Sequence, residues 1–315
     1  MDSSTSELNG ADRAAPGDII AVLEHARRQF LALVAQVRPE LHRYCARMTG
    51  SVTDGEDVVQ DTLARAYYEL SQFKDLPPLR PWLFRIAHNR AIDHWRHETH
   101  RRSEPLDAAS AIADDAAREP DNVLARRQAT QAALSCFLEL APAQRACVIL
   151  KDVLDHSIDE IALELTLSAP AVKAALHRGR VVLQGLTEAA PLGRPRRSPS
   201  SALLRYADLF NARDWDGVRA LLADDVKLDL VSRRKAAGRR EVGTYFSNYD
   251  HAVDWHLAPA WADGREVLAV VHPAGGSRRP RYFIELGWAD DRVIAIRDFR
   301  YVPYIDQEGR VELAG

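Results

Sequence analysis

Cysteines and long apolar runs are scarce in this sequence. Its 315 residues include three cysteines, Cys45, Cys136 and Cys147, which lie far apart and form no C-x-x-C pair. Such spacing is typical of reduced, buried thiols in a cytoplasmic protein and does not indicate a disulfide framework. No apolar run reaches the ~18 residues that a transmembrane helix needs. We therefore expect a cytoplasmic protein with no membrane partner.

Net charge is also small, and the sequence lacks the pattern of a signal peptide. The formal net charge is −3, while hydrophobic residues make up 46% of the chain. That much apolar material argues against global disorder. A surface that binds nucleic acid must then be a local basic patch. Residues 1–17 are polar and lack the basic start and apolar stretch of a signal peptide, so we expect a disordered tail.

Changes in composition divide the rest of the chain. Two stretches are typical of linkers, one acidic and rich in Ala, Asp and Pro, the other rich in Pro and Ser and locally basic. They separate two segments with helical periodicity from a third that begins as a helix and continues in short apolar runs. The expected boundaries are a tail at 1–17, helical domains at 18–103 and 123–190, linkers at 104–122 and 191–200, a mixed domain at 201–306 and a tail at 307–315.

The first helical segment contains a helix with a polar face. Thr53-x-x-Glu56 is a capping-box pattern, which predicts a helix start. Apolar residues then recur at helical spacing at Val59, Leu63, Ala66 and Leu70. The opposite face carries Asp57, Gln60, Asp61 and Arg65. By itself this pattern indicates either a solvated helix surface or a docking surface for a partner.

A basic and aromatic stretch follows that helix. Residues 80–102 contain six Arg against one Asp and one Glu, a local charge of +4 (6 − 2). Basic groups can bind phosphates, and an aromatic side chain or a loop pocket can hold an unstacked base. The aromatic residues that interleave with this stretch are Phe73, Trp82, Phe84 and Trp95. We expect Phe84 and Ile86 to lie in the core.

Three histidines, His94, His97 and His100, recur at every third position of the same segment. A zinc-binding H-E-x-x-H motif has its histidines four residues apart, so this spacing does not match it. We expect exposed histidines on a helix that faces DNA, with no metal and no other cofactor.

The second helical segment contains a helix-turn-helix pattern. Ser157-x-x-Glu160 is a capping box that opens a short helix, and residues 166–168 form the turn. Ser168 can cap the second helix, which has no acidic residue up to position 183 and so suits the DNA major groove. A left-handed backbone at Thr166 would cost about 1 kcal/mol. The basic side chains on the second helix are Lys173, His177, Arg178 and Arg180.

The order and spacing of these motifs resemble regions 2 and 4 of a sigma factor of the extracytoplasmic-function (ECF) group. The matching motifs lie at 54–61 and 81–90 for region 2, within 18–103, and at 157–162 and 172–180 for region 4, within 123–190. Thr166 stands where this family usually has Gly, and Ala174-Ala175 stand where many members have Ser and Arg. We therefore expect few direct base contacts, chiefly from Lys173 and Arg178.

The resemblance implies a role for each set of residues. It implies that the β′ clamp of RNA polymerase is bound by Glu56, Asp57, Gln60, Asp61 and Arg65. It implies that the minus-ten element is read by Phe73, Lys74, Arg80, Trp82, Arg85, Asn89, Arg90 and Arg96. It implies that the minus-thirty-five element is read by Ser168, Lys173, His177, Arg178 and Arg180.

The third segment predicts an α+β cone. Helical patterns at 201–211 and 214–226 precede expected strands at 226–230, 266–272, 282–288 and 292–298, with turns at Gly275-Gly276 and Asp290-Asp291. Helices followed by strands favour a cone of helices wrapped by a curved sheet. The passage from the helix into Leu221–Val226 resembles the SnoaL-like superfamily, which includes ketosteroid isomerase and nuclear transport factor two. In a subset of ECF sigma factors such a domain looks like a built-in regulator.

A concave pocket in that fold raises the question of an enzyme. Proton abstraction would need a carboxylate or His base that faces a donor such as Tyr. The candidate polar groups are Tyr206, Asp229, Tyr245, His251, His256 and Asp298. The sequence does not show that they converge, and we expect the aromatics to line a core and the acids to face water. The basic stretch 232–238 is a candidate contact for the acidic linker.

The sequence thus predicts a multi-domain protein with two all-α helical sigma domains, a region 2 bundle and a region 4 helix-turn-helix, plus a C-terminal α+β SnoaL-like cone. We expect a sigma factor, not an enzyme, whose partners are core RNA polymerase (β′ clamp and β flap) and promoter DNA, with the C-terminal domain regulating it in cis. A small ligand of that domain is left open. Two alternatives also stay open: an isomerase, hydrolase or ligand sensor fused to a DNA-binding module, and a helix-turn-helix repressor that uses no polymerase.

Overall fold

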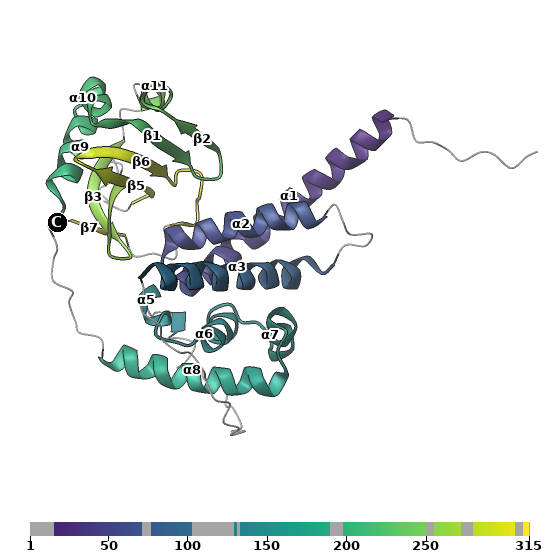
Figure 1. Ribbon diagram of the computed structural model, residues 1–315. Coiled ribbons are helices and arrows are strands. Elements are labelled where there is room, and N and C mark those ends of the chain that lie inside the picture. The colour runs from purple at the N-terminus through teal and green to yellow at the C-terminus, as the bar shows by residue number, and fades with distance from the viewer. Residues whose placement is uncertain are drawn as a thin grey trace, which may run out of the picture. The chain divides into compact units, whose positions relative to one another are not determined.

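The computed structural model describes residues 16–70, 77–102, 129–130, 133–189, 198–249, 255–271, 280–305 and 311–314 (Figure 1). Several predictions lie outside these residues: the acidic linker at 104–122, most of the second linker, the turn at Gly275-Gly276, and the side chains of Phe73, Lys74 and His251. None of the described helices is long and apolar enough to cross a membrane.

The first helix, α1, runs Pro16–Thr49 and contains Pro39. The contacts of the chain divide it at Pro39, so that residues up to Pro39 and residues from Glu40 onward form separate units. In the larger unit, the last turns of α1 bury Leu41, Tyr44, Cys45 and Met48, which recur at helical spacing. Gly50 follows the helix at φ 77°, a left-handed conformation that glycine adopts without strain.

Helices α2 (Val52–Leu70) and α3 (Leu79–Arg102) pack against each other (Figure 1). Helix α2 also approaches the end of α1 closely. A Cβ atom added at Gly55 would lie 2.6 Å from the Cα atom of Ala46, so glycine is required at this crossing.

The predicted capping box at Thr53 and Glu56 is wrong. Helix α2 begins at Val52, and the Ser51 hydroxyl accepts the Asp54 N–H at 3.3 Å. Glu56 cannot reach back to the helix start because its side chain is buried in contacts with the C-terminal domain.

The next helices belong to the helix-turn-helix segment: α5 (Leu134–Phe137), α6 (Pro142–Val148), the π-helix η1 (Ile149–Val153), α7 (Ile158–Leu165) and α8 (Ala169–Ala189). The capping box of α7 is confirmed, with Ser157 Oγ accepting the Glu160 N–H and the Glu160 carboxylate accepting the Ser157 N–H. Thr166 is left-handed at φ 56°, the conformation whose cost was considered for this turn. Ala133 is extended at ψ 147° directly before α5, so this helix starts only at Leu134.

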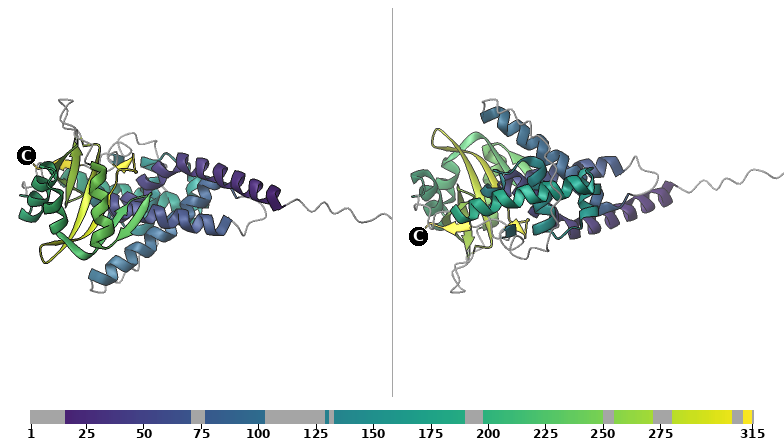
Figure 2. Two further views of the ribbon diagram at one scale, coloured as in Figure 1. Left: turned by 90° about the horizontal axis from the view of Figure 1, so that it is seen from above. Right: turned by 90° about the horizontal axis from the view of Figure 1, so that it is seen from below.

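The C-terminal domain combines helices with one seven-stranded sheet. Its helices are α9 (Ser201–Asn211), α10 (Trp215–Ala220), α11 (Arg239–Gly243) and the 3-10 helix η2 (Thr244–Tyr249). The strands are β1 (Leu222–Leu230), β2 (Arg234–Ala237), β3 (His256–Ala262), β4 (Arg265–Val271), β5 (Tyr282–Ala289), β6 (Arg292–Asp298) and β7 (Val311–Leu313). Their order is β2-β1-β6-β5-β4-β3-β7, and the sheet curves (Figure 2).

The sheet departs from the predicted one in two ways. The helix expected at 214–226 ends at Ala220, and β1 begins at Leu222. Strands β2, β3 and β7 were not predicted. The β3–β4 turn is Asp263-Gly264, with φ 50° and 83°, so an Asp-Gly hairpin signal was present in the sequence. The turn at Asp290-Asp291 is confirmed, with φ 47° and 59°.

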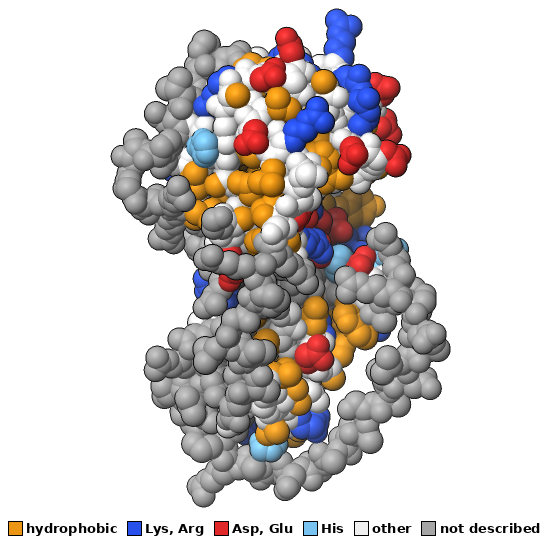
Figure 3. Space-filling model, turned by 90° about the vertical axis from the view of Figure 1, so that its left-hand side faces the viewer, with side chains coloured by type: hydrophobic (Ala, Val, Ile, Leu, Met, Phe, Trp, Pro, Cys, Tyr) orange, Lys and Arg blue, Asp and Glu red, His pale blue; other side chains and the backbone are white. Residues whose placement is uncertain are grey.

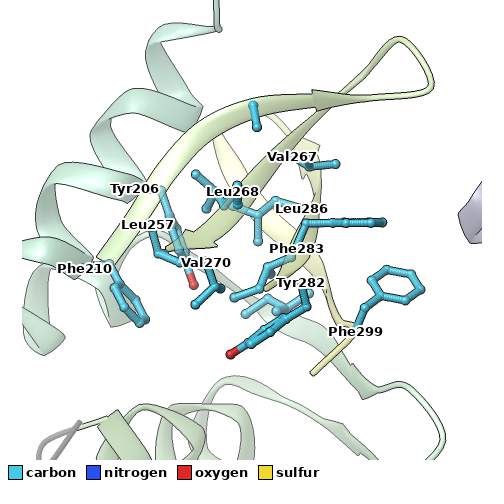
Figure 4. Packing of buried hydrophobic residues seen from close by; sticks show 14 of the residues in the cluster. Tyr206, Phe210, Leu257, Val267, Leu268, Val270, Tyr282, Phe283, Leu286 and Phe299 are labelled. Atoms are coloured by element: carbon cyan, nitrogen blue, oxygen red, sulfur yellow. The ribbon is translucent and has the colours of Figure 1, made fainter. Parts of the chain in front are cut away.

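The core of this domain lies between its helices and the sheet. In Figure 4, Tyr206 and Phe210 point from α9 toward strand side chains that include Leu257 and Val270. All four are buried. On the face shown in Figure 3, basic and acidic side chains of the domain are intermixed, so that face does not present a patch of one sign.

Candidate functional site

The first half of α2 carries three acidic side chains that meet the C-terminal domain. Glu56 is fully buried, and its carboxylate accepts hydrogen bonds from the Tyr304 hydroxyl at 2.9 Å and the Ser232 hydroxyl at 3.3 Å. Asp54 accepts both terminal nitrogens of Arg265, at 2.7 and 3.1 Å. The acids of this half therefore already have partners within the chain.

Asp57 pairs with a second arginine of the sheet. Arg297 Nη2 lies 2.5 Å from Asp57 Oδ1, and Arg297 Nη1 lies 3.4 Å from Glu285. Burial raises the pKa of Asp57 to about 6, with a smaller raise from Asp54, while Arg297 acts to lower it. The pair is thus a charged contact that is only partly desolvated.

The second half of α2 is open to solvent. Asp61 and Arg65 are exposed, Gln60 is half-buried, and Tyr68 is 62% exposed. Asp61, Arg65 and Tyr68 line an open depression together with Arg90 of α3. The five residues expected to bind the β′ clamp are therefore divided between a covered half (Glu56, Asp57) and an uncovered half (Asp61, Arg65), with Gln60 between them.

Helix α3 presents part of the expected basic surface. Arg85, Asn89 and Arg96 are exposed, and Arg90 is half-buried. Trp82 is only 4% exposed, so its ring lies in the core with Phe84, which is buried as predicted. The structure thus offers polar and basic groups of α3 for phosphate contacts, whereas the Trp82 ring is covered.

Arg80 lies in a polar network that joins region 18–103 to the helix-turn-helix segment. Its Nε and Nη2 atoms donate to Glu40 at 3.1 and 2.6 Å, and Nη2 lies 2.7 Å from His156 Nε2. His156 Nδ1 lies 2.9 Å from Glu164. Burial acts to raise the pKa of Glu40, but hydrogen bonds with His156 and Arg80 outweigh it and bring that pKa to about 2.

Arg145 makes the second polar connection between these segments. Its Nη1 atom donates to the Met48 carbonyl at 2.6 Å, and Nη2 donates to the carbonyls of Leu138 and Leu140 at 3.0 Å each. The side chain is 1% exposed, and burial lowers its pKa to about 10. Sequence reasoning missed this residue, because an Arg after a helix-starting Pro resembles an ordinary surface residue.

The second helix of the helix-turn-helix, α8, presents only some of its basic residues. Ser168 caps it by accepting the Ala171 N–H at 3.3 Å. Lys173 and His177 are exposed, and Arg178 is half-buried. Arg180 instead forms a two-contact ion pair with the buried Asp152, at 2.6 and 2.8 Å. Among the predicted minus-thirty-five residues, Ser168, Lys173 and His177 are exposed, and Lys173 and His177 are the exposed basic ones.

Two of the candidate pocket residues meet inside the C-terminal domain. Asp298 Oδ2 accepts the hydroxyls of Tyr245 at 2.5 Å and Tyr249 at 3.1 Å, and Oδ1 accepts the Arg300 N–H at 2.9 Å. Burial raises the pKa of Asp298. Tyr206 is buried nearby, and its pKa is raised by burial and by the Asp298 charge. Both carboxylate oxygens are engaged with donors of the chain itself, as in a structural hydrogen-bond cluster.

The remaining candidates lie apart from this cluster. Asp229 pairs in register with Arg297, while Asp298 is the next residue along β6. Because successive side chains of a strand point to opposite faces, Asp229 and Asp298 lie on opposite faces of the sheet. His256 is exposed at the start of β3. The described residues therefore bring Asp298 and Tyr245 together, with Tyr206 nearby, whereas Asp229 and His256 lie apart from them.

Comparisons with known proteins agree with this division. The Sigma-70 region 2 model matches residues 33–101, the Sigma-70 region 4 model matches 130–183, and the SnoaL-like domain model matches 203–297. The ECF RNA polymerase sigma factor SigF of Caulobacter vibrioides is 33% identical over 156 residues, 49% of this chain and 80% of SigF. The chain belongs to the ECF sigma factor family.

Similarity to this family extends into the C-terminal domain. The ECF RNA polymerase sigma factor SigG of Mycobacterium tuberculosis is 29% identical over 299 residues, 86% of this chain and 80% of SigG. The crystal structure of the extracytoplasmic function sigma factor SigJ of Mycobacterium tuberculosis covers 85% of this chain and 95% of SigJ, at 19% identity and a TM-score of 0.35. The predicted sigma regions 2 and 4 and the SnoaL-like domain are confirmed by the three domain models and by the similarity to SigG.

Sequence reasoning missed the residues of the C-terminal domain that meet α2 in this sigma factor. Arg265, Arg297 and Tyr304 lie more than two hundred positions from their partners, as the separations of 211, 240 and 248 residues show. The Asp263-Gly264 pair was a local signal for a hairpin turn. It predicts where the turn lies, but it does not predict that the turn contacts α2.

Proposed function

We propose that this protein binds core RNA polymerase and directs promoter-specific initiation of transcription. The observation that carries the proposal is that an α2–α3 pair with an acidic helix and a helix-turn-helix with a basic second helix occur in one chain, matched by the region 2 and region 4 models. Helix α2 is the docking helix for the β′ clamp, region 4 contacts the β flap, and the protein acts in the cytoplasm on promoter DNA.

The exposed basic residues give the proposal its DNA-contacting groups. Arg85, Asn89 and Arg96 on α3 are suited to phosphates and splayed bases of the minus-ten element. Lys173 and His177 on α8 are suited to the minus-thirty-five element in the major groove. Arg80, Trp82 and Arg180 join these contacts only if their present partners release them.

We propose that the C-terminal domain regulates initiation in cis and carries out no chemistry. Its attachment to α2 through Arg265 and Arg297 supports a regulatory role. Asp298, its most buried acid, is engaged by Tyr245, Tyr249 and a backbone N–H, which supports a structural role for that cluster.

Initiation in vitro tests the proposed function. Asp61→Lys changes an exposed residue of α2, so we expect a folded protein that loses most initiation with core polymerase on a panel of genomic promoters. The matched control is Asp208→Lys, an equal charge change on exposed α9, which should initiate like the unchanged protein. A repressor that uses no polymerase would bind DNA equally well with Asp61→Lys and would initiate with neither variant.

A further inference from the structure

Four side chains of the C-terminal domain form a stack of guanidinium groups and aromatic rings. The guanidinium groups of Arg233 and Arg300 lie 5.6 and 5.7 Å from the centre of the Tyr301 ring. Arg300 also lies 4.2 Å from the centre of the Trp255 ring. Arg233 directly precedes β2, Trp255 directly precedes β3, and the other two follow β6, so the fold brings distant segments together here. We call these four residues the arginine–aromatic stack.

The stack is open to solvent. Tyr301 is 43% exposed, Arg233 and Arg300 are exposed, and Trp255 is half-buried. Cation–π contacts extend to about 6 Å from the ring centre, so both guanidinium groups lie near the outer limit at Tyr301. The shorter distance from Arg300 to Trp255 places Arg300 firmly on the Trp255 ring. The Tyr301 ring can therefore accept a flat ligand without loss of a close contact.

The two arginines of the stack lack the acidic partner that a neighbouring arginine has. Arg234, next to Arg233, pairs with Glu241 at 2.6 Å. Within the part of the chain that the structure describes, Arg233 and Arg300 form no ion pair with a carboxylate. Asp298 accepts the backbone N–H of Arg300, at 2.9 Å, and does not bond its guanidinium. Two positive charges therefore remain for an anion from outside the chain.

Exposed arginines beside an exposed aromatic ring are the chemistry that binds single-stranded nucleic acid. An unstacked base packs on the ring, and the arginines contact phosphates along the strand. In a duplex the faces of the bases are covered by their neighbours, so the ring has nothing to stack on. An acidic peptide would pair with the arginines but has no flat face for the ring. The combination favours a single strand over either.

The stack borders the contact with region 2. Ser232, next to Arg233, donates to the Glu56 carboxylate of α2 at 3.3 Å. Tyr304, close to Tyr301 in the sequence, donates to the same carboxylate at 2.9 Å. The stack therefore lies at the edge of the domain that is proposed to read the minus-ten element.

We infer that the arginine–aromatic stack binds single-stranded DNA, with a base packed on the Tyr301 ring and phosphates bound by Arg233 and Arg300. This inference rests on the proposed function, because initiation is the process that supplies single-stranded DNA beside region 2. It adds a DNA-contacting surface on the C-terminal domain to those on α3 and α8.

Binding of a fluorescent oligothymidine by the full chain, measured by anisotropy, tests the ring. Tyr301→Leu keeps an apolar side chain but removes the ring, and it should weaken binding about tenfold because each stacked base contributes strongly to affinity. Tyr301→Phe keeps the ring and should bind like the unchanged chain. A side chain that only fills space on the surface would not distinguish leucine from phenylalanine in this way.

The salt dependence of the same binding tests the arginines. Arg233→Gln with Arg300→Gln removes both cationic groups. The slope of log affinity against log salt concentration should become shallower by about 1.4, since each phosphate contact of a single strand contributes about 0.7. The matched control, Arg205→Gln with Arg240→Gln at exposed positions of the same domain, should leave the slope unchanged. Should the double variant not fold, Arg233→Gln alone should make the slope shallower by about 0.7.

Three results would overturn the inference. The first is oligothymidine binding by folded Tyr301→Leu equal to that of the unchanged chain, since any attraction would then be electrostatic only. The second is competition by thymidine monophosphate as effective as competition by unlabelled oligothymidine at equal nucleotide concentration, since the site would then take a free nucleotide. The third is an unchanged chain that binds no oligothymidine. If that chain still initiates with core polymerase, the proposed function stands without this surface; if it does not initiate, the proposed function falls as well.

Discussion

Region 2 is held at two places by polar contacts of charged side chains. Toward the C-terminal domain, Asp54 and Asp57 pair with arginines whose side chains reach solvent. Toward region 4, Arg145 is fully enclosed and His156 is buried between Glu40 and Glu164. Desolvated charges resist both salt and separation from their partners, so the Asp54 and Asp57 ion pairs should be more sensitive to salt than the contacts of Arg145 and His156. Glu56, which is fully buried against the C-terminal domain, does not share that sensitivity.

Removal of the buried arginine should give the largest effect. Arg145→Met keeps an apolar stem but leaves the carbonyls of Met48, Leu138 and Leu140 without their donor. Buried polar groups that lose partners cost about 1–3 kcal/mol each, and we expect a loss of about 3 kcal/mol of unfolding free energy. Chemical denaturation measures it, with exposed Arg205→Met as a control that should stay within about 0.5 kcal/mol. A loss below about 1 kcal/mol for Arg145→Met would remove the distinction between the two contacts.

A smaller effect should come from Glu40 in the same buried contact. Its pKa falls from an ordinary 4.5 to about 2, so its stabilising contribution is present above pH 4.5 and is lost as the pH falls through about 2. Glu40→Gln should therefore lower the unfolding free energy by about 2 kcal/mol at pH 7, allowing for partial exposure of the side chain.

Acid unfolding curves of both chains check this. The difference in unfolding free energy between Glu40→Gln and the unchanged chain should narrow as the pH falls below 4.5. The control Glu312→Gln, at an exposed position, should differ little from the unchanged chain at any pH. His88, whose burial lowers its pKa to about 4, titrates in both chains and cancels from the difference. A gap that is constant from pH 7 to pH 3 would show that the Glu40 charge does not stabilise this contact.

The same two contacts show how far the sequence could lead. The helix-turn-helix was predictable because its signals are local: a capping box at Ser157 and Glu160, and Ser168 as the cap of the second helix. The ECF motifs likewise indicated α2 and α3. The burial of Glu56 was not predictable, because the polar face of a helix has the same pattern whether water or another domain covers it. Its partner Tyr304 lies 248 residues away, and no periodicity of either segment records that contact.

The smallest predicted effect concerns the pH dependence of the exposed contact. Four charged groups face Asp57: Arg297 on β6, Asp229 on β1, and Asp54 and Glu56 on α2 itself. Burial outweighs Arg297 and raises the pKa of Asp57 from 3.8 to about 6. We call the form in which the C-terminal domain contacts α2 the closed form. A carboxyl whose pKa is raised in the closed form stabilises that form at low pH, and this stabilisation is lost as the pH rises through about 6. Closure should therefore strengthen as the pH falls from 7 toward 4.

The size of that change should be less than about 1 kcal/mol, because the Asp57 side chain is 48% exposed and solvent screens it. Energy transfer between a donor on α3 and an acceptor on β4 measures closure at constant ionic strength. Asp57→Asn mimics the protonated acid, so it should hold the transfer near its low-pH level at every pH. Weaker closure at pH 5 than at pH 7.5 would contradict this prediction. An unchanged pH response with Asp57→Asn would assign the titration to another group. In either case the salt-sensitive arginine pairs, and not Asp57, would control the separation of the C-terminal domain from α2.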